Sequence, residues 1–518
     1  VSHLHLLDVL ERLEEEGFLQ FREQAVRIGH DMLGECVLDL LPPATRRAVH
    51  AYIASHLERG FETSHDAALL WDCAEQWVMS GDTDKAVEFL RRCALHAADL
   101  GRAAQALRLL ERVMELVTDP GEKAEVLRDM MISGKAAGHW SEVHRCSQQL
   151  AALSAESPTH SDIELLSVEA CWMMSFQVGD ATTRLLACAS AVTADPNHRL
   201  DAAILLMRIA HERGDAALAR SAYESAEKLL TNTGYSSRLL PLIYHTSFGD
   251  RDRALEAARA LRHDLASFQP ITLQFRAGFN VATAFAYLGE REALDLYREL
   301  YDLASQLGMK AWQWQFASSL CWWQLEHENV DAAEEWYERT EGSRPGDLMS
   351  TAERRKNVGC ACEIALRRHD VPRAREMILR LRAVGAAESI RAAIYIDTFE
   401  LRLLQLDQST LSTDEEIDEL MRVFSTGRSL IGVDFLVVAL GEALRRRGRQ
   451  REAQAILDAY AREYRRERSP LPQSFLALRD RICMEIRLLP EDASVMLSGC
   501  ANALHVVTPP ASRIEASS

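Results

Sequence analysis

The sequence predicts an all-α protein built as a solenoid of paired helices, with one β-hairpin near its start. Three observations support this prediction. Apolar residues recur at intervals of three and four along nearly the whole chain, segments with strand character are almost absent, and one small turn motif returns at a regular spacing. At 518 residues the chain is also too long for a single compact core, which favours several domains or a repeat array.

The recurring turn has a glycine five residues before an alanine. The glycine ends one helix in a left-handed conformation, an acidic residue behind it suits the start of the next helix, and the small alanine lets the two helices pack closely. Clear copies are Gly81/Ala86, Gly101/Ala106, Gly214/Ala219, Gly249/Ala254 and Gly448/Ala453. Weaker copies start at Gly138, Gly179 and Gly289, whereas Glu328 and His369 replace the glycine in two others. Between residues 101 and 369 successive copies lie 35 to 41 residues apart, which is typical of helix-pair repeats.

The first 60 residues have a different pattern. Residues 4–16 predict an amphipathic helix, and the apolar pairs Phe18/Phe21 and Val26/Ile28 on either side of a polar turn predict a β-hairpin. Asp31 is placed to cap a helix over residues 32–41, and Pro42 and Pro43 end that helix and begin another. Helix, hairpin and helix together predict the C-terminal half of a winged helix.

These elements give four predicted segments. Residues 1–60 are the winged-helix half, residues 61–468 are a solenoid of about ten helix pairs, residues 469–505 are capping helices, and residues 506–518 are a flexible tail. The repeat array resembles tetratricopeptide (TPR) repeats, although its period is longer than usual. In this respect it is similar to the superhelical arm of bacterial maltose-regulator-type activators.

The stretch "GHDMLGECVLDLLPPATRRAVHAYIASHLE" resembles the segment that joins the winged helix to the repeats in STAND-class signal-transduction ATPases. Relatives carry Met-His-Asp where this chain has Gly29, His30 and Asp31. The resemblance implies that His30 and Asp31 sense the nucleotide, with His30 contacting the β-phosphate of ADP, when an upstream ATPase core is present. From the residues alone, the alternative interpretation is a helix N-cap beside an exposed imidazole.

The resemblance implies a sensor and regulatory arm. The solenoid would bind a trigger, either a protein or a small molecule, and control ATPase-driven oligomerisation in bacterial transcriptional regulation or anti-phage defence. The alternative is a stand-alone adaptor for protein partners. The chain carries no P-loop, since the nearest segment, around Lys135, lacks the first glycine and the Ser/Thr. We therefore expect no enzyme activity, no cofactor and no metal in this chain, with ADP or ATP bound only by the full-length protein.

Charge and cysteine usage limit the other functional classes. The net charge of -18 disfavours direct nucleic-acid binding, because a polyphosphate needs clustered Lys and Arg. No apolar run is long enough to span a membrane. The 11 cysteines have no disulfide or metal-site spacing, which predicts reduced thiols and a cytoplasmic protein.

Two regions are candidate partner surfaces. Five of the nine tryptophans lie between residues 312 and 336, and helical spacing puts Trp312, Phe316 and Trp323 on one core stripe. Trp314 and Trp322 then either pack on the next repeat or line a ligand groove. The second candidate surface is Arg445, Arg446 and Arg447, which form either a solvated helix face or a contact for an acidic partner.

Overall fold

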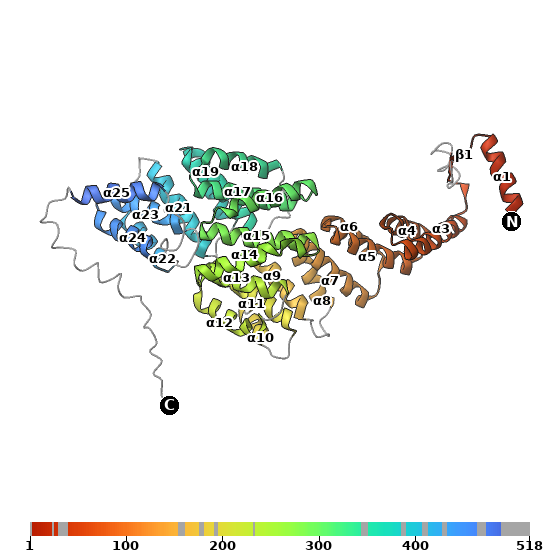
Figure 1. Ribbon diagram of the computed structural model, residues 1–518, viewed down its shortest axis with the longest axis horizontal. Helices are drawn as coiled ribbons and strands as arrows, with labels where there is room; N and C mark the ends of the chain where they lie inside the picture. The colour runs from red at the N-terminus through yellow and green to blue at the C-terminus, as the bar shows by residue number, and fades with distance from the viewer. Residues whose placement is uncertain are drawn as a thin grey trace, which may run out of the picture. The chain divides into compact units, whose positions relative to one another are not determined.

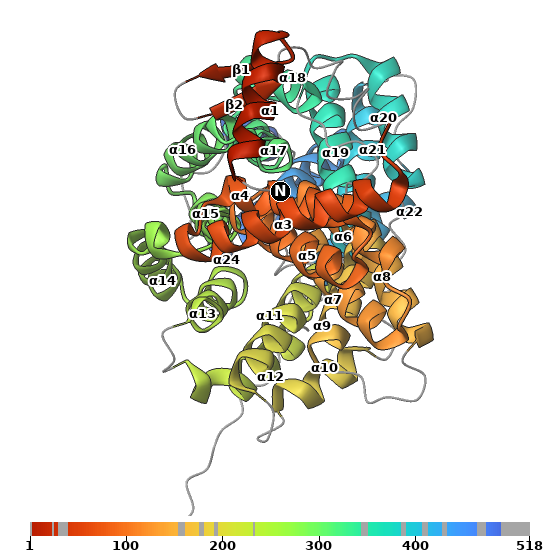
Figure 2. The ribbon, with the colours of Figure 1, turned by 90° about the vertical axis from the view of Figure 1, so that its right-hand side faces the viewer.

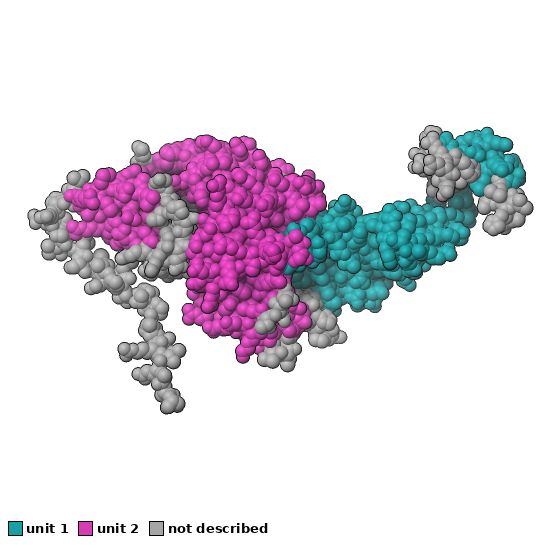
Figure 3. Space-filling model, in the orientation of Figure 1, with its two compact units in different colours: residues 1–170, 268–274 teal, residues 171–267, 275–518 magenta. Residues whose placement is uncertain are grey.

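The structure is a computed structural model. It describes residues 3–22, 25–28, 40–153, 161–175, 181–190, 195–230, 234–342, 351–384, 390–406, 413–426, 433–463 and 473–487. The chain forms two compact units (Figure 3). Unit 1 comprises residues 1–170 and 268–274, and unit 2 comprises residues 171–267 and 275–518.

The start of unit 1 contains the predicted helix and hairpin. Helix α1 is His3–Glu15, and strands β1 (Leu19–Arg22) and β2 (Ala25–Ile28) pair antiparallel with Leu19 opposite Ile28 and Arg22 opposite Ala25. The two predictions for residues 4–28 are therefore confirmed. His30, Asp31, residues 32–39 of the predicted helix 32–41 and the predicted tail lie outside the described residues.

The rest of unit 1 is a run of helices in which each packs against the next from α3 to α8 (Figure 1). They are α3 (Pro43–Ser64), α4 (Ala67–Ser80), α5 (Thr83–Asp99), α6 (Ala103–Leu116), α7 (Pro120–Ala137), α8 (Trp140–Leu153) and most of α9 (Ser161–Ser175). Helix α3 begins at the predicted proline but continues past residue 60 and packs along α4. The boundary predicted at residue 60 therefore falls inside the first helix of the array.

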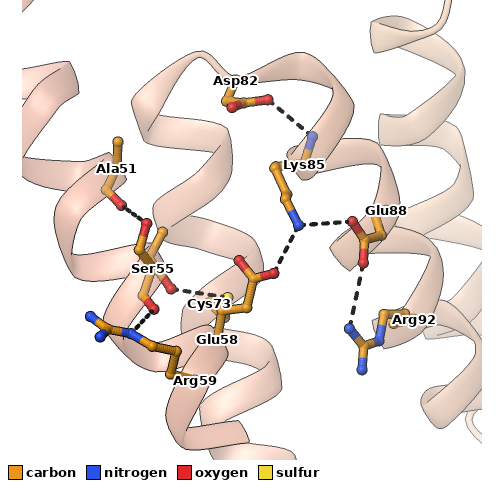
Figure 4. A network of polar contacts seen from close by, with 10 residues as sticks. Ala51, Ser55, Glu58, Arg59, Cys73, Asp82, Lys85, Glu88 and Arg92 are labelled. Atoms are coloured by element: carbon orange, nitrogen blue, oxygen red, sulfur yellow. Dashed lines mark hydrogen bonds and ion pairs between the residues drawn. The ribbon is translucent and has the colours of Figure 1, made fainter. Parts of the chain in front are cut away.

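Polar contacts also join α3 to α5 (Figure 4). Lys85 Nζ lies 2.8 Å from Glu58 Oε1 on α3 and 3.2 Å from Glu88 Oε2 on its own helix. Behind them the Cys73 thiol donates to the carbonyl of Ala54, 3.5 Å away, where both residues are fully buried. Exposed ion pairs add little stability. The buried side chains between the helices therefore provide most of the packing energy.

Unit 2 continues the same pattern with the remaining helices. The first set is α10 (Ala181–Ser190), α11 (Pro196–Arg213), α12 (Ala216–Ala226), the 3₁₀ turn η1 (Glu227–Leu229), α13 (Tyr235–Ser247), α14 (Arg251–His263), the 3₁₀ turn η2 (Leu265–Ser267) and α15 (Ile271–Leu288), of which the part from residue 275 belongs to unit 2. The second set is α16 (Glu292–Gln306), α17 (Lys310–Glu326), α18 (Val330–Gly342), α19 (Thr351–Arg367), α20 (Val371–Ala383), α21 (Ile390–Leu406), α22 (Asp414–Thr426), α23 (Val433–Arg446), α24 (Gln450–Glu463) and α25 (Gln473–Arg487).

The recurring turn has the predicted geometry. Gly81, Gly101, Gly214 and Gly448 have φ values from 65° to 76°, and the alanine five residues after each is at most 2% exposed. Where the glycine is replaced, Glu328 and His369 hold φ values of 60° and 59°, so the turn is kept at a steric cost. Aspartates cap the helices that follow Gly81 and Gly214, where Asp82 accepts from the Lys85 amide at 3.1 Å and Asp215 from the Leu218 amide at 2.9 Å.

Gly249 is the exception among the clear copies, because it does not have a positive φ. A Cβ at this position would lie 2.4 Å from His245 Nδ1, so glycine is required there by close packing against the preceding helix. Ala254 nevertheless remains fully buried, as in the other copies. Glycine therefore occupies this position of the motif for two different reasons: a left-handed backbone in most copies, and the lack of space for a Cβ at Gly249.

Within unit 2 the first helices of successive pairs lie next to one another. Figure 2 shows α11, α13, α15, α17 and α19 following an arc, and α21 packs directly against α11. The array therefore curls until helices far apart in sequence touch. The described fold is an all-α, TPR-like helix-pair solenoid with one β-hairpin, as predicted. None of its described helices has the length and apolar character needed to cross a membrane.

Candidate functional site

The left-handed residue that ends the first helix of a pair marks which side chains of that helix face the inner, concave side of the curved array. Side chains two and six residues before the turn lie one helical turn apart on the same face. In unit 2 these pairs are Arg208/Glu212, Thr283/Tyr287, Trp322/Glu326, Glu363/Arg367 and Glu442/Arg446, counted back from residues 214, 289, 328, 369 and 448. All of these residues except Arg208 and Glu363 line the two hollows described below.

The first hollow, which we call the aromatic cavity, has a volume of about 360 Å³. Its walls come mainly from α15, α16, α17, α19 and α21, with Glu212 from α11. The aromatic lining residues are Phe279, Tyr287, Tyr297, Trp322, Trp323, Tyr395 and Phe399. Tyr297, Trp323 and Phe399 are at most 5% exposed and form the rigid wall, whereas the other four rings are half-buried and face the space. A cavity of this size lined by aromatic rings suits a small ligand or one bulky side chain.

Hydrogen bonds hold the polar groups of the aromatic cavity in place. Tyr297 Oη and Thr283 Oγ1 are 2.9 Å apart, and burial raises the pKa of Tyr297 although the Thr283 contact opposes the rise. Lys356 Nζ donates to Ser319 Oγ over 2.7 Å and lies 5.7 Å from the centre of the Phe279 ring. Trp322 Nε1 donates to Glu326 Oε1 over 3.0 Å.

The second hollow, which we call the arginine groove, has a volume of about 590 Å³. It extends along the ends of α19, α21, α23 and α25, and Glu326 lines both hollows, so they meet at the end of α17. Four arginines line it: Arg367, Arg402, Arg446 and Arg481. Arg481 is exposed and has no ion pair among the described residues. The groove therefore presents an accessible guanidinium at its α25 end.

A buried carboxylate organises the groove. Glu363 on α19 is fully buried and pairs with Arg367, at 2.5 Å, and with Arg402 on α21. Burial on its own would raise the pKa of Glu363, but the two guanidinium groups more than offset it and the pKa is lowered. The carboxylate therefore stays ionised and links two successive repeats.

The two predicted tryptophans have different environments. Trp314 is 1% exposed, so it belongs to the core of α17, and the prediction that it lies on a partner surface is wrong. Trp322 is half-buried, packs against the core cluster of α19 to α21, and lines the aromatic cavity. Its ring packs edge-to-face on Tyr395 of the next repeat, with 5.5 Å between ring centres. Trp322 therefore both packs on the next repeat and lines a cavity, which the sequence had left open as alternatives. Its role in ligand binding stays a prediction.

The predicted arginine surface is mostly an internal network. Arg445 lies 2.8 Å from both Glu442 and Glu485, and Arg447 lies 3.4 Å from Asp414 on α22. Arg446 bonds Glu442 at 2.9 Å and the carbonyl of Gln405 at 2.8 Å, and it lines the arginine groove. Arg446 and Arg447 are exposed, as the interpretation as a solvated helix face predicts, although all three arginines are also tied to other parts of the chain. Contact of Arg446 with a partner stays a prediction.

No group of three or more His, Cys, Asp or Glu suited to a metal ion occurs in the part of the chain that the structure describes. The cysteines of these residues are free thiols, and several are buried. The sequence reasoning missed Tyr395 and Arg402, which line the two hollows, and Glu363, which pairs with Arg367 and Arg402 behind the groove. Counting back two and six residues from each turn would have found Glu363, but Tyr395 and Arg402 lie on α21, whose following turn has no glycine to mark it.

No protein-family model and no curated protein matches this chain. Among solved structures, yeast Tom70 is similar over 89% of this chain and 99% of its own, with 11% identity and a TM-score of 0.30. The Cut9–Hcn1 hetero-tetramer of the APC/C is similar over 89% of this chain and 88% of the matched chain, with 12% identity and a TM-score of 0.43. These similarities are low, and the TPR-like architecture rests on the helix pairing described above.

Proposed function

We propose that this chain is a recognition scaffold that binds a protein partner along the inner face of unit 2. The observation that carries the proposal is the regular placement of inner-face residues, two and six before each turn, around two adjoining hollows. An extended segment in the arginine groove could be held by the guanidinium groups, with a bulky side chain in the aromatic cavity. We include a cytoplasmic location in this proposal, as the scattered cysteines suggest.

Site-specific photo-crosslinking in cells tests the proposal. A benzophenone amino acid replaces His369 or Arg481, which are exposed and line the arginine groove, or Arg380, which is exposed on α20 and lines neither hollow. We expect one protein, identified by mass spectrometry, to be crosslinked from both groove positions and not from Arg380. Equal crosslinking from all three positions, or crosslinking from Arg380 alone, would contradict an inner-face site.

A second candidate function is the regulatory arm of a STAND-class ATPase, with the scaffold's partner or a small molecule as the trigger. The observation that favours it is helix α1 followed directly by the β1–β2 hairpin, ahead of the repeats. In that setting His30 and Asp31 would sense ADP, and binding of the trigger would permit oligomerisation. The test is the mass of the native gene product with peptide mapping. P-loop peptides upstream support the regulatory arm, and their absence leaves the adaptor.

A further inference from the structure

The aromatic cavity contains a carboxamide with no hydrogen-bond partner among the described residues. Gln315 Oε1 on α17 is buried and unbonded, and neither atom of the amide has a partner among the described residues. Other amides in the same unit are bonded, since Gln313 Nε2 donates to the carbonyl of Ala304 at 3.2 Å and Gln405 Nε2 to that of Ala439 at 2.7 Å. An unbonded buried acceptor is costly, so Gln315 is a recognition group rather than a packing group.

Flat rings surround this amide. Phe279, Tyr287, Trp322 and Tyr395 are half-buried and leave part of their ring surface open to the cavity. Opposite Trp322 stands Gly359, where even an added Cβ would lie 3.9 Å from the indole, so the wall there is flat. Aromatic side chains favour planar partners in stacked or edge-to-face contact. The shape of the cavity therefore suits a planar ring.

The charges of the lining disfavour an anionic ligand. Three carboxylates, Glu212, Glu326 and Glu353, outnumber the two cations. Arg355 is 3.6 Å from Glu212, and Lys356 is bound to Ser319. One turn from Gln315, the Ser319 hydroxyl donates to the main-chain carbonyl of Gln315 and accepts from the Lys356 ammonium. The side-chain amide of Gln315 itself offers one acceptor and one donor, so it can bind a neutral group that carries one donor and one acceptor side by side.

We propose that the aromatic cavity binds a small, neutral aromatic or heteroaromatic amide, whose N–H and C=O pair with the Gln315 carboxamide while its ring packs among Trp322, Tyr395 and Phe279. This class includes primary arylamides, cyclic lactams and the amide edges of nucleobases. It deepens the function proposed above, because it names the ligand of one part of the inner face. An Asn or Gln side chain of a bound peptide carries the same amide without the ring.

The experiment uses the full chain and four fragment probes: benzamide, acetophenone, propionamide and benzoate. Binding is followed by saturation-transfer NMR and by the fluorescence of the tryptophans that line the cavity. Acetophenone keeps the ring and the carbonyl but lacks the N–H, so benzamide should bind about tenfold more tightly. Propionamide, which lacks the ring, and benzoate, which is anionic, should both bind more weakly than benzamide.

In Gln315→Met, which keeps the side-chain volume, the preference for benzamide over acetophenone should vanish, and acetophenone should also bind more weakly because its C=O loses the Gln315 N–H. Gln313→Met on the same helix is the matched control, because Gln313 does not line the cavity, and it should keep the preference. If Gln315→Met unfolds, Gln315→Leu serves instead, since it also removes both the acceptor and the N–H donor and should likewise abolish the preference.

Three results would overturn the proposal: equal binding of benzamide and acetophenone by the wild type, an unchanged ratio in the folded Gln315 variant, or propionamide binding as tight as benzamide. The last result would assign the amide site to an Asn or Gln side chain of a peptide. If the groove positions still crosslink one partner while the probes fail, only the ligand assignment is wrong. If the probes bind as expected but no inner-face crosslink forms, the scaffold function is wrong and the cavity is a small-molecule site alone.

Discussion

Replacing Arg402 with methionine should destabilise the C-terminal repeats more than replacing Glu363 with glutamine. Glu363 is fully buried, and its two partners, Arg367 and Arg402, are 17% and 21% exposed in their side chains. Removing one partner of a buried ion pair leaves an uncompensated charge and costs about 3–5 kcal/mol. Here Arg367 keeps part of the compensation, so we expect the lower end, about 3 kcal/mol.

Glu363→Gln removes the buried charge instead. The two arginines can then reach water at their partly exposed ends, and a neutral amide still bonds one of them, so the cost should be about 1–2 kcal/mol. The double variant Glu363→Gln/Arg402→Met should therefore be more stable than Arg402→Met alone, because it no longer buries an uncompensated charge. Urea unfolding gives the free energies, and hydrogen exchange of peptides from α19 and α21 locates the loss. An Arg402→Met variant within about 0.5 kcal/mol of wild type, or a double variant less stable than Arg402→Met, would refute the reasoning.

The same pair predicts a pH dependence with a definite sign. The pKa of Glu363 is lowered in the folded chain, since the effect of the two guanidinium groups exceeds that of burial. The stability that this carboxylate contributes is therefore fully present above the ordinary Glu pKa of about 4.3 and is lost as the pH falls through its lower folded value. In Arg402→Met the loss should begin at a higher pH, which acid titration of the exchange rates in α19 and α21 would detect.

Two substitutions test the geometry of the repeats, and one labelling experiment tests the burial of two cysteine thiols. His369→Gly should raise the free energy of unfolding by about 1 kcal/mol, because His369 holds a left-handed φ of 59°, while His369→Ala should give no gain, and urea unfolding compares the two. Ala374→Leu should cost about 1–3 kcal/mol by overpacking a fully buried site, read as a lower urea midpoint. Burial raises the pKa of Cys93 and of Cys146 to about 12, so iodoacetamide at a mildly alkaline pH of about 8 should modify neither in the native chain and both after unfolding, as mass spectrometry would report.

The turn motif was predictable because its parts obey local rules. A glycine, an aspartate and an alanine at fixed offsets encode a left-handed residue, an N-cap and a close helix contact, and each effect acts within a few residues. Glu328 and His369 could be placed only by the spacing of the copies around them. The structure confirms that both adopt the conformation that glycine would have taken.

The two tryptophans show where local rules fail. Trp314 and Trp322 both lie off the predicted core stripe of one helix, and periodicity alone gives no reason to separate them. In a solenoid, however, the first helix of a pair is covered by its partner and by the helices before and after it, so only a narrow inner stripe remains open. Trp322, six residues before the turn, lies on that stripe, and Trp314, eight residues earlier, is enclosed with 1% exposure.

The side chains on this inner stripe change along unit 2 from mainly aromatic to mainly charged, and the two hollows lie in these two parts of the stripe. Its pairs run from Thr283/Tyr287 and Trp322/Glu326, which line the aromatic cavity, to Glu363/Arg367 and Glu442/Arg446 at the arginine groove. Helix α21 packs against α11, and both contribute to the aromatic cavity, whereas the arginine groove continues to α25. An aromatic space beside a charged one allows two ligand classes to bind next to each other, with Glu326 lining both. A small molecule in the cavity would therefore alter the groove through the Trp322–Glu326 hydrogen bond, and a Trp322→Phe variant, which removes the indole N–H and keeps an aromatic ring, should uncouple the two.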